Sequence, residues 1–339
     1  MAPEAQTGKQ PTPALLFDTF NAYQRTQAIK TGIELEVFTA IGEGNTTAKA
    51  IAERCSASER GTRILCDFLT IMGFLTKQDN NYELTADSAM FLDKRSPGYM
   101  GAVTGFILSP NVVDNFDRLT ESVRKGGCAG PSSVEPEHPM WVDFARAMAP
   151  MMALPAQLMA QLVDPTKDKK LRVLDIAAGH GLYGIAFAKQ NPQAEVTAID
   201  WMKVLDVAKE NAQAAGVADR YHTKPGSAFD VDYGTGYDVV LLTNFLHHFD
   251  KETCETLLRK VHASLADGGR AAALEFVPNE DRVTPPQAAG FSMQMLGGTP
   301  SGDAYTFIEL ERMFQNAGFA RSEMYELPPT IERVVIGYK

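Results

Sequence analysis

The segment that decides the fold of this chain reads Val173-Leu174-Asp175-Ile176-Ala177-Ala178-Gly179-His180-Gly181-Leu182-Tyr183-Gly184. It lies within and just after an apolar run, residues 171–177, which has the length of a strand that is covered on both faces. Gly179 and Gly181 free the backbone to turn and let a ligand approach, and the amide groups of the following helix point at that ligand. The segment therefore predicts a strand-turn-helix unit that binds a nucleotide-like cofactor.

Two acidic residues bear on which cofactor this is. Asp175 lies inside the strand, and Asp200 ends a second apolar strand at residues 195–199. Asp200 is placed to accept hydrogen bonds from two ribose hydroxyls, each worth roughly 1.5–3 kcal/mol, which suits NAD and S-adenosylmethionine equally. The spacing Gly179-x-Gly181-x-x-Gly184 matches the dinucleotide fingerprint, so an NAD-dependent dehydrogenase stays open. Dehydrogenase fingerprints usually have an apolar residue at the position of Asp175, so this acidic residue argues against a dehydrogenase.

Strand and helix patterns alternate beyond residue 171. Strands are expected at 171–177, 195–199, 237–243 and 270–276, and helices at 182–190, 202–215 and 251–265. This alternation predicts a doubly wound, Rossmann-like α/β sheet. Two last strand-like runs, at about 321–327 and 331–338, are joined by Pro328-Pro329 and are expected to pair antiparallel at the edge of the sheet.

The first hundred residues follow another pattern. After a polar tail at 1–13 they show helical periodicity at 15–28 and 34–41, a short helix capped near Thr47, a longer helix ending near Gly73 and a hairpin pattern at 74–85. That order is typical of a winged helix-turn-helix, so a DNA-binding regulator is a second hypothesis.

Charge argues against DNA as the ligand. Residues 1–100 carry a net charge of −2, and the helix that would read DNA, residues 60–71, is strongly apolar. We therefore interpret residues 14–95 as a winged-helix dimerisation domain, mostly α-helical. Residues 96–165 are expected to form a helical linker and substrate-pocket region, and residues 166–339 the catalytic domain.

Composition sets broader limits. The chain has 339 residues, 45% of them hydrophobic, and a net charge of −10, which disfavours binding to nucleic acid or to an anionic membrane and favours a small-molecule partner. Its cysteines form no C-x-x-C pair, residues 1–13 lack the features of a signal peptide, and no apolar run reaches the ~18 residues that span a bilayer. We expect a soluble, cytoplasmic protein, without a metal site because no Cys, His and acidic residues cluster with ligand spacing.

These features together resemble the S-adenosylmethionine-dependent small-molecule O-methyltransferases of the caffeate type, which include bacterial polyketide and carotenoid enzymes. The resemblance covers nearly the whole chain. It implies S-adenosylmethionine as cofactor, S-adenosylhomocysteine as product, a homodimer joined through the N-terminal domain, and a hydroxyl of an aromatic or polyketide-like molecule as acceptor. Methylation of a carbon atom, for example in a tetrapyrrole, stays open, as does a descendant that keeps the cofactor without methylating.

The resemblance also assigns the catalytic residues. The family motif Leu-His-Asp-Trp corresponds to Leu246-His247-His248-Phe249, so His247 inherits the role of general base. The family's catalytic glutamate, 28 residues further on, corresponds to Glu275, which would orient the imidazole. The plant members' second glutamate corresponds to Ala304, with Asp303 and Tyr305 as the neighbouring residues that could replace it.

Cofactor and substrate positions follow in the same way. The segment Gly226-Ser227-Ala228-Phe229 corresponds to the family's adenine-binding segment, where Ser227 stands in place of an acidic residue. The implied cofactor site comprises Asp175, Gly179, Gly181, Asp200, Trp201, Ser227, Ala228, Phe229 and Thr243. The implied substrate wall comprises Phe144, Met148 and Met295, together with a loop expected at 290–305, and Phe20 and Tyr23 are expected to contact the partner subunit.

Overall fold

The computed structural model describes residues 10–164 and 169–339, and the predictions for residues 1–9 and for the boundary at 165 lie outside them. By its contacts the chain divides after Leu108 into two compact units. We call residues 10–108 the N-terminal unit and the described residues from 109 onward the catalytic unit.

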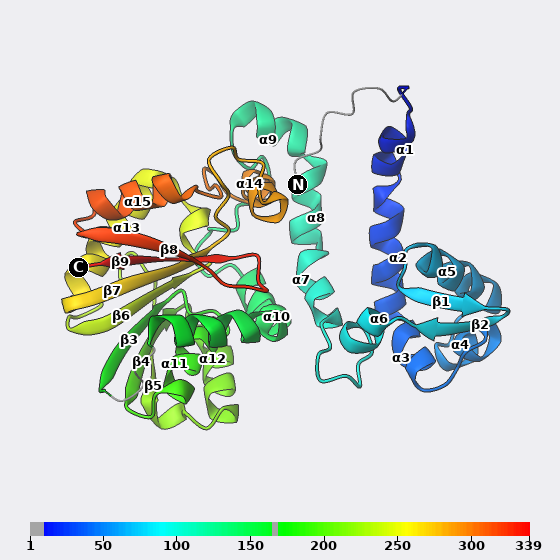
Figure 1. Cartoon of the computed structure of the whole chain (residues 1–339), viewed down its shortest axis with the longest axis horizontal. Helices are drawn as coiled ribbons and strands as arrows, with labels where there is room; N and C mark the ends of the chain where they lie inside the picture. Colours follow the sequence, from blue (N-terminus) through cyan, green and yellow to red (C-terminus); the bar gives the residue numbers. More distant parts are fainter. Residues whose placement is uncertain (1–9, 165–168) are drawn as a thin grey trace. The chain divides into compact units, whose positions relative to one another are not determined.

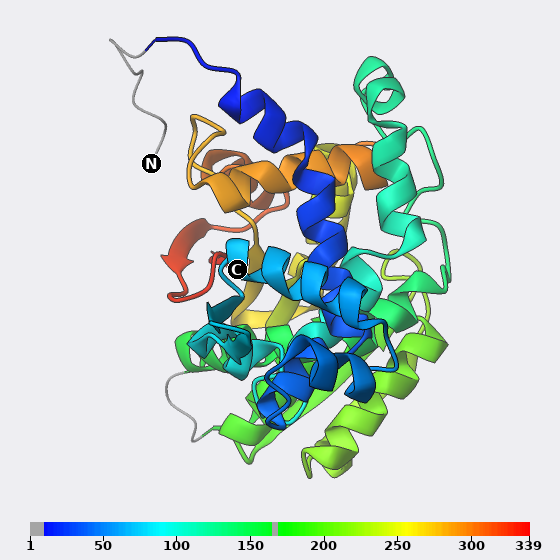
Figure 2. The ribbon, with the colours of Figure 1, turned by 90° about the vertical axis from the view of Figure 1, so that its right-hand side faces the viewer.

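The N-terminal unit contains the predicted helices and hairpin. Its elements are α1 (Ala14–Phe20), α2 (Ala22–Glu34), α3 (Val37–Gly42), α4 (Ala48–Arg54), α5 (Glu59–Ile71), β1 (Leu75–Gln78), β2 (Asn81–Leu84), α6 (Ala86–Phe91), η1 (Gly101–Val103) and α7 (Thr104–Ile107). Thr47 and Ser58 cap α4 and α5 by accepting hydrogen bonds from backbone amides. The helical pattern at 15–28 is split at Asn21, and α1 and α2 follow one another with a bend between them that is seen in Figure 2 but hardly in Figure 1.

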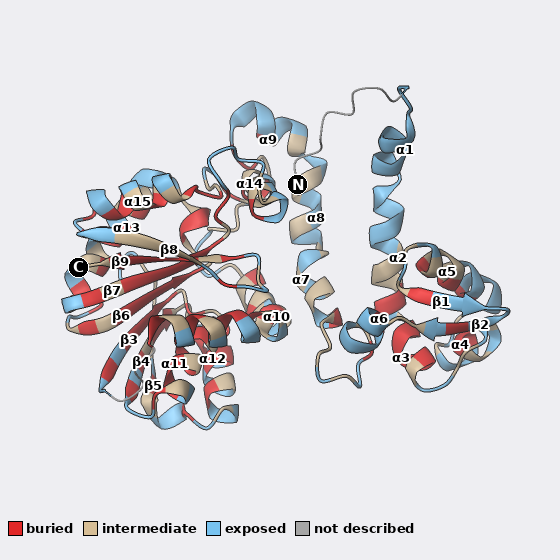
Figure 3. Ribbon diagram, viewed as in Figure 1, coloured by how far each residue is buried: buried red, intermediate tan, exposed pale blue. Residues whose placement is uncertain are grey.

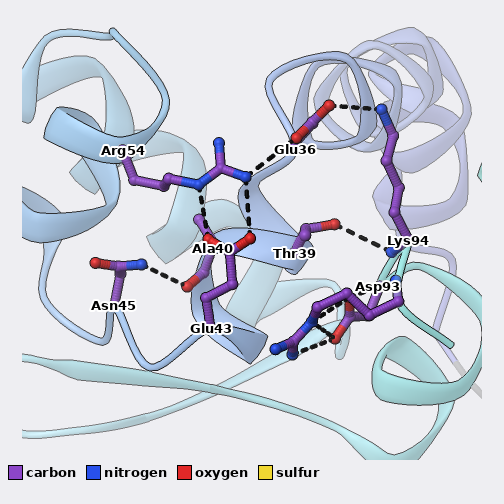
Figure 4. Close-up of polar contacts among 9 residues, drawn as sticks. Glu36, Thr39, Ala40, Glu43, Asn45, Arg54, Asp93 and Lys94 are labelled. Carbon is purple, nitrogen blue, oxygen red and sulfur yellow. Dashed lines mark hydrogen bonds and ion pairs between the residues drawn. The ribbon is translucent and has the colours of Figure 1, made fainter.

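Ion pairs close the corner between α2 and α3. Arg54 on α4 bonds to Glu43 at 2.7 Å and to Glu36 at 3.3 Å, and Lys94 reaches the other oxygen of Glu36 at 2.6 Å (Figure 4). In the same network, the Thr39 hydroxyl accepts a hydrogen bond from the Lys94 amide. These bonds tie residues 93–95 back to α3, over a core that includes Phe38 and Leu69.

The catalytic unit is a seven-stranded sheet between helices. Its helices are α8 (Pro110–Asp117), α9 (Leu119–Lys125), α10 (Met140–Val163), α11 (Leu182–Gln190), α12 (Met202–Ala214), η2 (Ala218–Arg220), η3 (Leu246–His248), α13 (Lys251–Ser264), α14 (Pro286–Gly298) and α15 (Phe307–Asn316). Its strands are β3 (Leu171–Ile176), β4 (Ala194–Asp200), β5 (Tyr221–Pro225), β6 (Tyr237–Thr243), β7 (Leu265–Glu275), β8 (Arg321–Glu326) and β9 (Arg333–Tyr338).

The strand order is β5-β4-β3-β6-β7-β9-β8, with β3 to β7 parallel and β9 antiparallel to both β7 and β8. Helices α13 and α15 pack on one face, and α10, α11 and α12 lie together on the other (Figure 1). The strands between them are mostly buried (Figure 3). The predicted doubly wound sheet with an antiparallel C-terminal hairpin is confirmed.

Two elements differ from the sequence-based expectation. Strand β5 was not expected, because at the edge of the sheet its residues are mostly polar and lack an apolar run. Helix α14 runs through residues 286–298, where a loop was expected from 290, so that expectation was wrong for its first part. Gly290, Gly297 and Gly298 lower the intrinsic helix propensity there, but packing against α8 and α9 outweighs it.

Candidate active site

The parallel strands bring the predicted residues to one edge of the sheet. Asp175 is near the carboxyl end of β3, Asp200 ends β4, Thr243 ends β6 and Glu275 ends β7. Because β3 is paired with both β4 and β6, and β6 with β7, these four positions follow one another along that edge. Ligands of open α/β sheets bind at this edge.

His247 and Glu275 form a direct pair. Nδ1 of His247 lies 2.5 Å from Oε2 of Glu275, and both side chains are almost fully buried, with exposures of 5% and 4%. The other carboxylate oxygen, Oε1, accepts hydrogen bonds from the amides of Phe245 and Leu246, at 3.0 and 2.8 Å. Glu275 is therefore held by the loop that carries His247, and it fixes the imidazole through one nitrogen.

Aromatic rings surround this imidazole. Phe291 of α14 meets it edge to face at 4.8 Å, and Phe276 stacks on Phe291 at 4.0 Å. On the other side the His248 ring lies 4.4 Å from His247 and meets Trp141 of α10. Burial and the neighbouring His247 lower the pKa of His248, so His248 is neutral and acts as part of this apolar wall.

Asp200 is held at the turn after β3. Its Oδ2 accepts the amide of Gly179 at 2.8 Å, and its Oδ1 accepts the amide of Trp201 at 2.7 Å. Burial raises the pKa of Asp200 to about 6 against these two hydrogen bonds. Gly179 has a φ of 57°, and a Cβ built there would meet nothing nearer than 3.9 Å. The Gly179 turn is therefore open to a ligand next to the Asp200 carboxylate.

Gly181 has a different structural role. It also has a positive φ, 75°, but a Cβ there would lie 2.6 Å from the Tyr221 hydroxyl and 2.9 Å from Cβ of Ala208. The glycine is thus required by the turn and by the packing of α11 against α12 and β5, and its part in a cofactor site stays a prediction.

Asp175 is fully buried and only half satisfied. Its Oδ2 accepts the amide of Gly184 at 3.0 Å, whereas Oδ1 has no hydrogen-bond partner in the described part of the chain. Burial raises the pKa of Asp175 to about 7, and the charge of Asp200 adds to this shift. A buried carboxylate oxygen without a donor is an acceptor for a group from outside the chain.

The remaining cofactor positions lie around the same edge. The Ser227 hydroxyl accepts the amide of Phe229, and Lys260 fixes the segment by donating to the carbonyls of Ala228 and Phe229. Phe229 is 36% exposed and packs edge to face on Phe249. Thr243 is buried at the end of β6, and Trp201 directly precedes α12 without a capping hydrogen bond from its side chain.

The predicted substrate residues come from two helices. Phe144 and Met148 lie on α10, and Met295 lies on α14 rather than on a loop. The ring of Phe144 stacks on that of His180, with 6.4 Å between the ring centres. Its Cε1 atom would lie 3.9 Å from a Cβ built on Gly179. Met148 and Met295 are both 5% exposed. Their contribution to a substrate pocket stays a prediction.

The two candidates for the missing second glutamate are bound elsewhere. Asp303 forms an ion pair with Arg282 at 3.1 Å, and the Tyr305 hydroxyl donates to the carbonyl of Phe249 at 2.5 Å. The acidic residue beside the site is Glu332, which sequence reasoning missed. It directly precedes β9, and the first residue of β9, Arg333, lies opposite Glu275 in the backbone register of the sheet. The Oε1 of Glu332 accepts a hydrogen bond from the side-chain amide of Asn244 at 2.9 Å. The only sequence signal was an acid next to an apolar strand.

Two further observations concern residues 10–164 and 169–339. No group of three or more His, Cys, Asp and Glu residues there is arranged to hold a metal ion. None of the helices in these ranges combines the length and apolar character needed to span a membrane.

Comparison with known proteins identifies both units. The model of the O-methyltransferase domain matches residues 135–320, and the model of the O-methyltransferase dimerisation domain matches residues 17–94. A solved structure from Nostoc punctiforme, described as a candidate O-methyltransferase, is 56% identical, with a TM-score of 0.93 over 98% of this chain and 100% of that chain.

Several curated relatives come from Streptomyces. The 3-hydroxy-5-methyl-1-naphthoate 3-O-methyltransferase of Streptomyces sahachiroi is 29% identical, over 96% of this chain and 95% of the relative. The L-tyrosine C(3)-methyltransferase of Streptomyces lavendulae is 26% identical, over 97% and 91%. With the family models covering both units, the chain belongs to the S-adenosylmethionine-dependent O-methyltransferase family.

Proposed function

We propose that the chain transfers the methyl group of S-adenosylmethionine to a hydroxyl of an aromatic or polyketide-like small molecule, with His247 as the general base. The observation that carries this proposal is the His247–Glu275 pair, buried among aromatic rings at the carboxyl edge of the sheet. The naphthoate-methylating relative supports an aromatic acceptor.

The residues at the edge of the sheet fit the methyl donor. Asp200 offers a carboxylate to ribose hydroxyls, beside the open turn at Gly179. Asp175 keeps one buried oxygen without a donor, which suits the ammonium group of the donor's methionine part. The bound donor supplies a methyl group on a positively charged sulfur, which is already activated for transfer. Position of the acceptor then contributes much of the rate.

His247 would remove the proton of the acceptor hydroxyl. A phenol with a pKa of ~10 is only about 0.1% ionised at pH 7, so a base improves it as a nucleophile, typically by ~10²–10⁴ in rate. Because Nδ1 of His247 faces a carboxylate, that nitrogen carries the proton and Nε2 is the acceptor. Glu275 then stabilises the imidazolium that forms, and the ring wall of Phe291, Phe276 and His248 restricts water.

Titration calorimetry tests the donor site first. Wild type is expected to bind S-adenosylmethionine and S-adenosylhomocysteine with micromolar affinity and to give no heat with NAD, and Asp200→Ala is expected to lose both sulfur ligands. Binding of NAD alone would contradict the proposal. A screen of aromatic hydroxyl compounds then compares wild type with His247→Gln, and the exposed His222→Gln on β5 is the matched control. A rate loss below ~10-fold for His247→Gln would remove His247 from the chemistry.

Methylation of carbon is a second candidate. It is favoured by the L-tyrosine C(3)-methyltransferase, which is 26% identical over 97% of this chain. The same base can activate an aromatic carbon by removing the proton of a phenol hydroxyl. Mass spectrometry with fragmentation of the methylated product distinguishes a methoxy group from a methyl group on the ring.

We also propose a homodimer formed through the N-terminal unit. All of α1 is exposed, including Leu15, Phe17 and Phe20 with exposures of 79%, 58% and 64%, and Tyr23 of α2 is 64% exposed. Phe17, Phe20 and Tyr23 lie at the start of the segment that matches the dimerisation model, which begins at residue 17. Light scattering is expected to give a dimer for wild type and a monomer for Phe17→Glu combined with Phe20→Glu. A dimer of unchanged stability in that variant would exclude this surface.

A further inference from the structure

The candidate active site holds more acidic than basic groups. Asp175, Asp200, Glu275 and Glu332 all lie at the carboxyl edge of the sheet or next to it. In the described part of the chain, Glu275 alone among these four forms an ion pair, and its partner is His247. The other three carboxylates are bonded only to neutral amide groups.

Glu332 is the least expected member of this set. Its side chain, 5% exposed, comes from the connection between β8 and β9, far in sequence from the family motifs. Asn244, which directly follows β6, holds Oε1 through its side-chain amide, and the adjoining loop carries His247. Oε2 has no hydrogen-bond partner among residues 10–164 and 169–339. Glu332 is thus fixed in place with half of its carboxylate available.

Four groups face Glu332 from the elements packed around it. The charge of Glu275 on β7 opposes its ionisation, and His247 favours it when its imidazole is protonated. Asn244 contributes a neutral amide, and Tyr183 on α11 is neutral because burial and these carboxylates raise the pKa of its hydroxyl. Burial, the largest effect, raises the pKa of Glu332 to about 7. A positive charge brought to this region would therefore be stabilised by Glu332 in its ionised form.

We propose that Glu332 discriminates by charge between the two cofactor forms, because its buried carboxylate beside the His247–Glu275 pair favours the cationic methyl donor over the neutral thioether product. This inference rests on the function proposed above. It makes Glu332 a binding residue that helps the donor to enter and the product to leave, rather than a base.

The chemistry of the transfer supports this assignment. The carbon–sulfur bond of the donor breaks, a carbon–oxygen bond forms, and the hydroxyl proton passes to His247. The sulfur is positively charged before the step and neutral after it. Since the oxygen that receives the methyl group is the one deprotonated by His247, the positive charge passes from the sulfur to the nearby imidazole, and it leaves the site when that proton is released to solvent. Glu332 interacts electrostatically with His247 and forms no ion pair in the described part of the chain.

Glu332→Gln removes the charge and keeps the shape. The glutamine oxygen can still accept the hydrogen bond from Asn244, so the loop that carries His247 stays in place. Glu326→Gln is the matched control, because Glu326 belongs to the same hairpin but is 75% exposed and pairs with Arg333 at 3.3 Å. Glu332→Asp keeps the charge and serves as the conservative variant.

Titration calorimetry with S-adenosylmethionine and S-adenosylhomocysteine at about pH 8 tests the proposal. Glu332→Gln is expected to weaken binding of S-adenosylmethionine by roughly 5- to 10-fold and binding of S-adenosylhomocysteine by less than about 2-fold. Glu332→Asp and Glu326→Gln are expected to keep the ratio of wild type. In wild type the preference for the cation is expected to increase from about pH 6 to about pH 8, as Glu332 ionises.

Three results would contradict the proposal. An equal loss of affinity for both ligands would make Glu332 a structural residue, and an unchanged ratio in Glu332→Gln would overturn the inference. If that variant does not fold, a wild-type ratio that is the same at about pH 6 and about pH 8 would overturn it. Failure of wild type to bind either ligand contradicts the proposed function instead, so the two failures are distinguishable.

Discussion

The N-terminal unit and the carboxyl edge of the catalytic unit's sheet use carboxylates in opposite ways. In the N-terminal unit, Glu36, Glu43 and Asp93 are bonded to arginine or lysine, and these bonds lower the pKa of each carboxyl. In the catalytic unit, burial raises the pKa of Asp175, Asp200 and Glu332 to between about 6 and about 7, and none of the three has a cationic partner in the described residues.

This difference separates structural from functional acids. A carboxylate paired near the surface contributes to the fold and is satisfied within the chain. A buried carboxylate that is bonded only to neutral groups is costly in the free protein, and a ligand with hydroxyl or cationic groups can offset that cost. The raised pKa values of Asp175, Asp200 and Glu332 thus support the proposal that these acids bind a ligand.

Glu275 is the one of the four carboxylates at the edge of the sheet that forms an ion pair in the described residues, and its replacement is expected to have the largest effect. In Glu275→Gln the side-chain NH₂ would face Nδ1 of His247, provided that the remaining oxygen keeps the amides of Phe245 and Leu246. Nδ1 would then act as acceptor and the proton would move to Nε2, so His247 could no longer remove a proton. We expect kcat to fall by ~10²–10⁴ with little change in donor affinity. A loss below ~10-fold would show that the pair does not set the tautomer.

Asp200→Asn tests whether a buried acid without a cationic partner serves to bind the cofactor. We expect the affinity for S-adenosylhomocysteine to fall by roughly 10- to 100-fold, since hydrogen bonds from ribose hydroxyls to a carboxylate are lost or weakened. The melting temperature of the ligand-free protein at about pH 8 is expected to change little, because removal of a buried charge is offset by the loss of one of the two backbone hydrogen bonds. A fall in both quantities would mean that Asp200 stabilises the fold like the acids of the N-terminal unit.

The stability of the two units is expected to respond differently to pH. A raised carboxyl pKa contributes stability below the unfolded value of ~4 that is lost as pH rises through about 6 to 7, so the ligand-free catalytic unit should be more stable at about pH 5.5 than at about pH 8. His180 and His248, whose pKa values are lowered by burial, oppose this trend but are fewer.

The carboxyls of the N-terminal unit have lowered pKa values, so their contribution is present above ~4 and is lost only in more acidic solution. Over the same interval this unit should therefore change little. Hydrogen exchange by mass spectrometry, corrected for the intrinsic rate at each pH, reports each unit separately. Equal responses of the two units would contradict the distinction.

Glu43→Gln is expected to have the smallest effect. Arg54 keeps its bond to Glu36, and the side chains in this network are about one third exposed, so solvent screens them (Figure 4). We expect the melting temperature of the N-terminal unit to fall by less than about 3 °C. Calorimetry, with Glu34→Gln on the α2 surface as control, checks this value. A fall well beyond that limit would make the network a main support of the unit.

Local pattern predicted much of the molecule. The strand at 237–243 and the helix at 182–190 agree with the structure residue by residue, because a central strand or helix buries a continuous apolar run or stripe. The family motif placed His247, and the spacing to Glu275 placed its partner at the end of the next strand, where the structure joins them. Neighbouring parallel strands end at the same edge of the sheet, so residues that follow or end these strands lie close together for many different loop conformations.

Other features depend on contacts between distant segments. Helix α14 forms in a glycine-containing segment because α8 and α9 pack on it, and Gly181 is required by the positions of Tyr221 and Ala208. Glu332 enters the site because the C-terminal strand β9 returns antiparallel beside β7 and places the residue before it next to Asn244. Sequence alone therefore determined the fold class through its periodicity, and the family and the His247–Glu275 pair through the resemblance of its motifs. Only the tertiary structure decided the position of Glu332, because that position depends on β9, which lies between β7 and β8 out of sequence order.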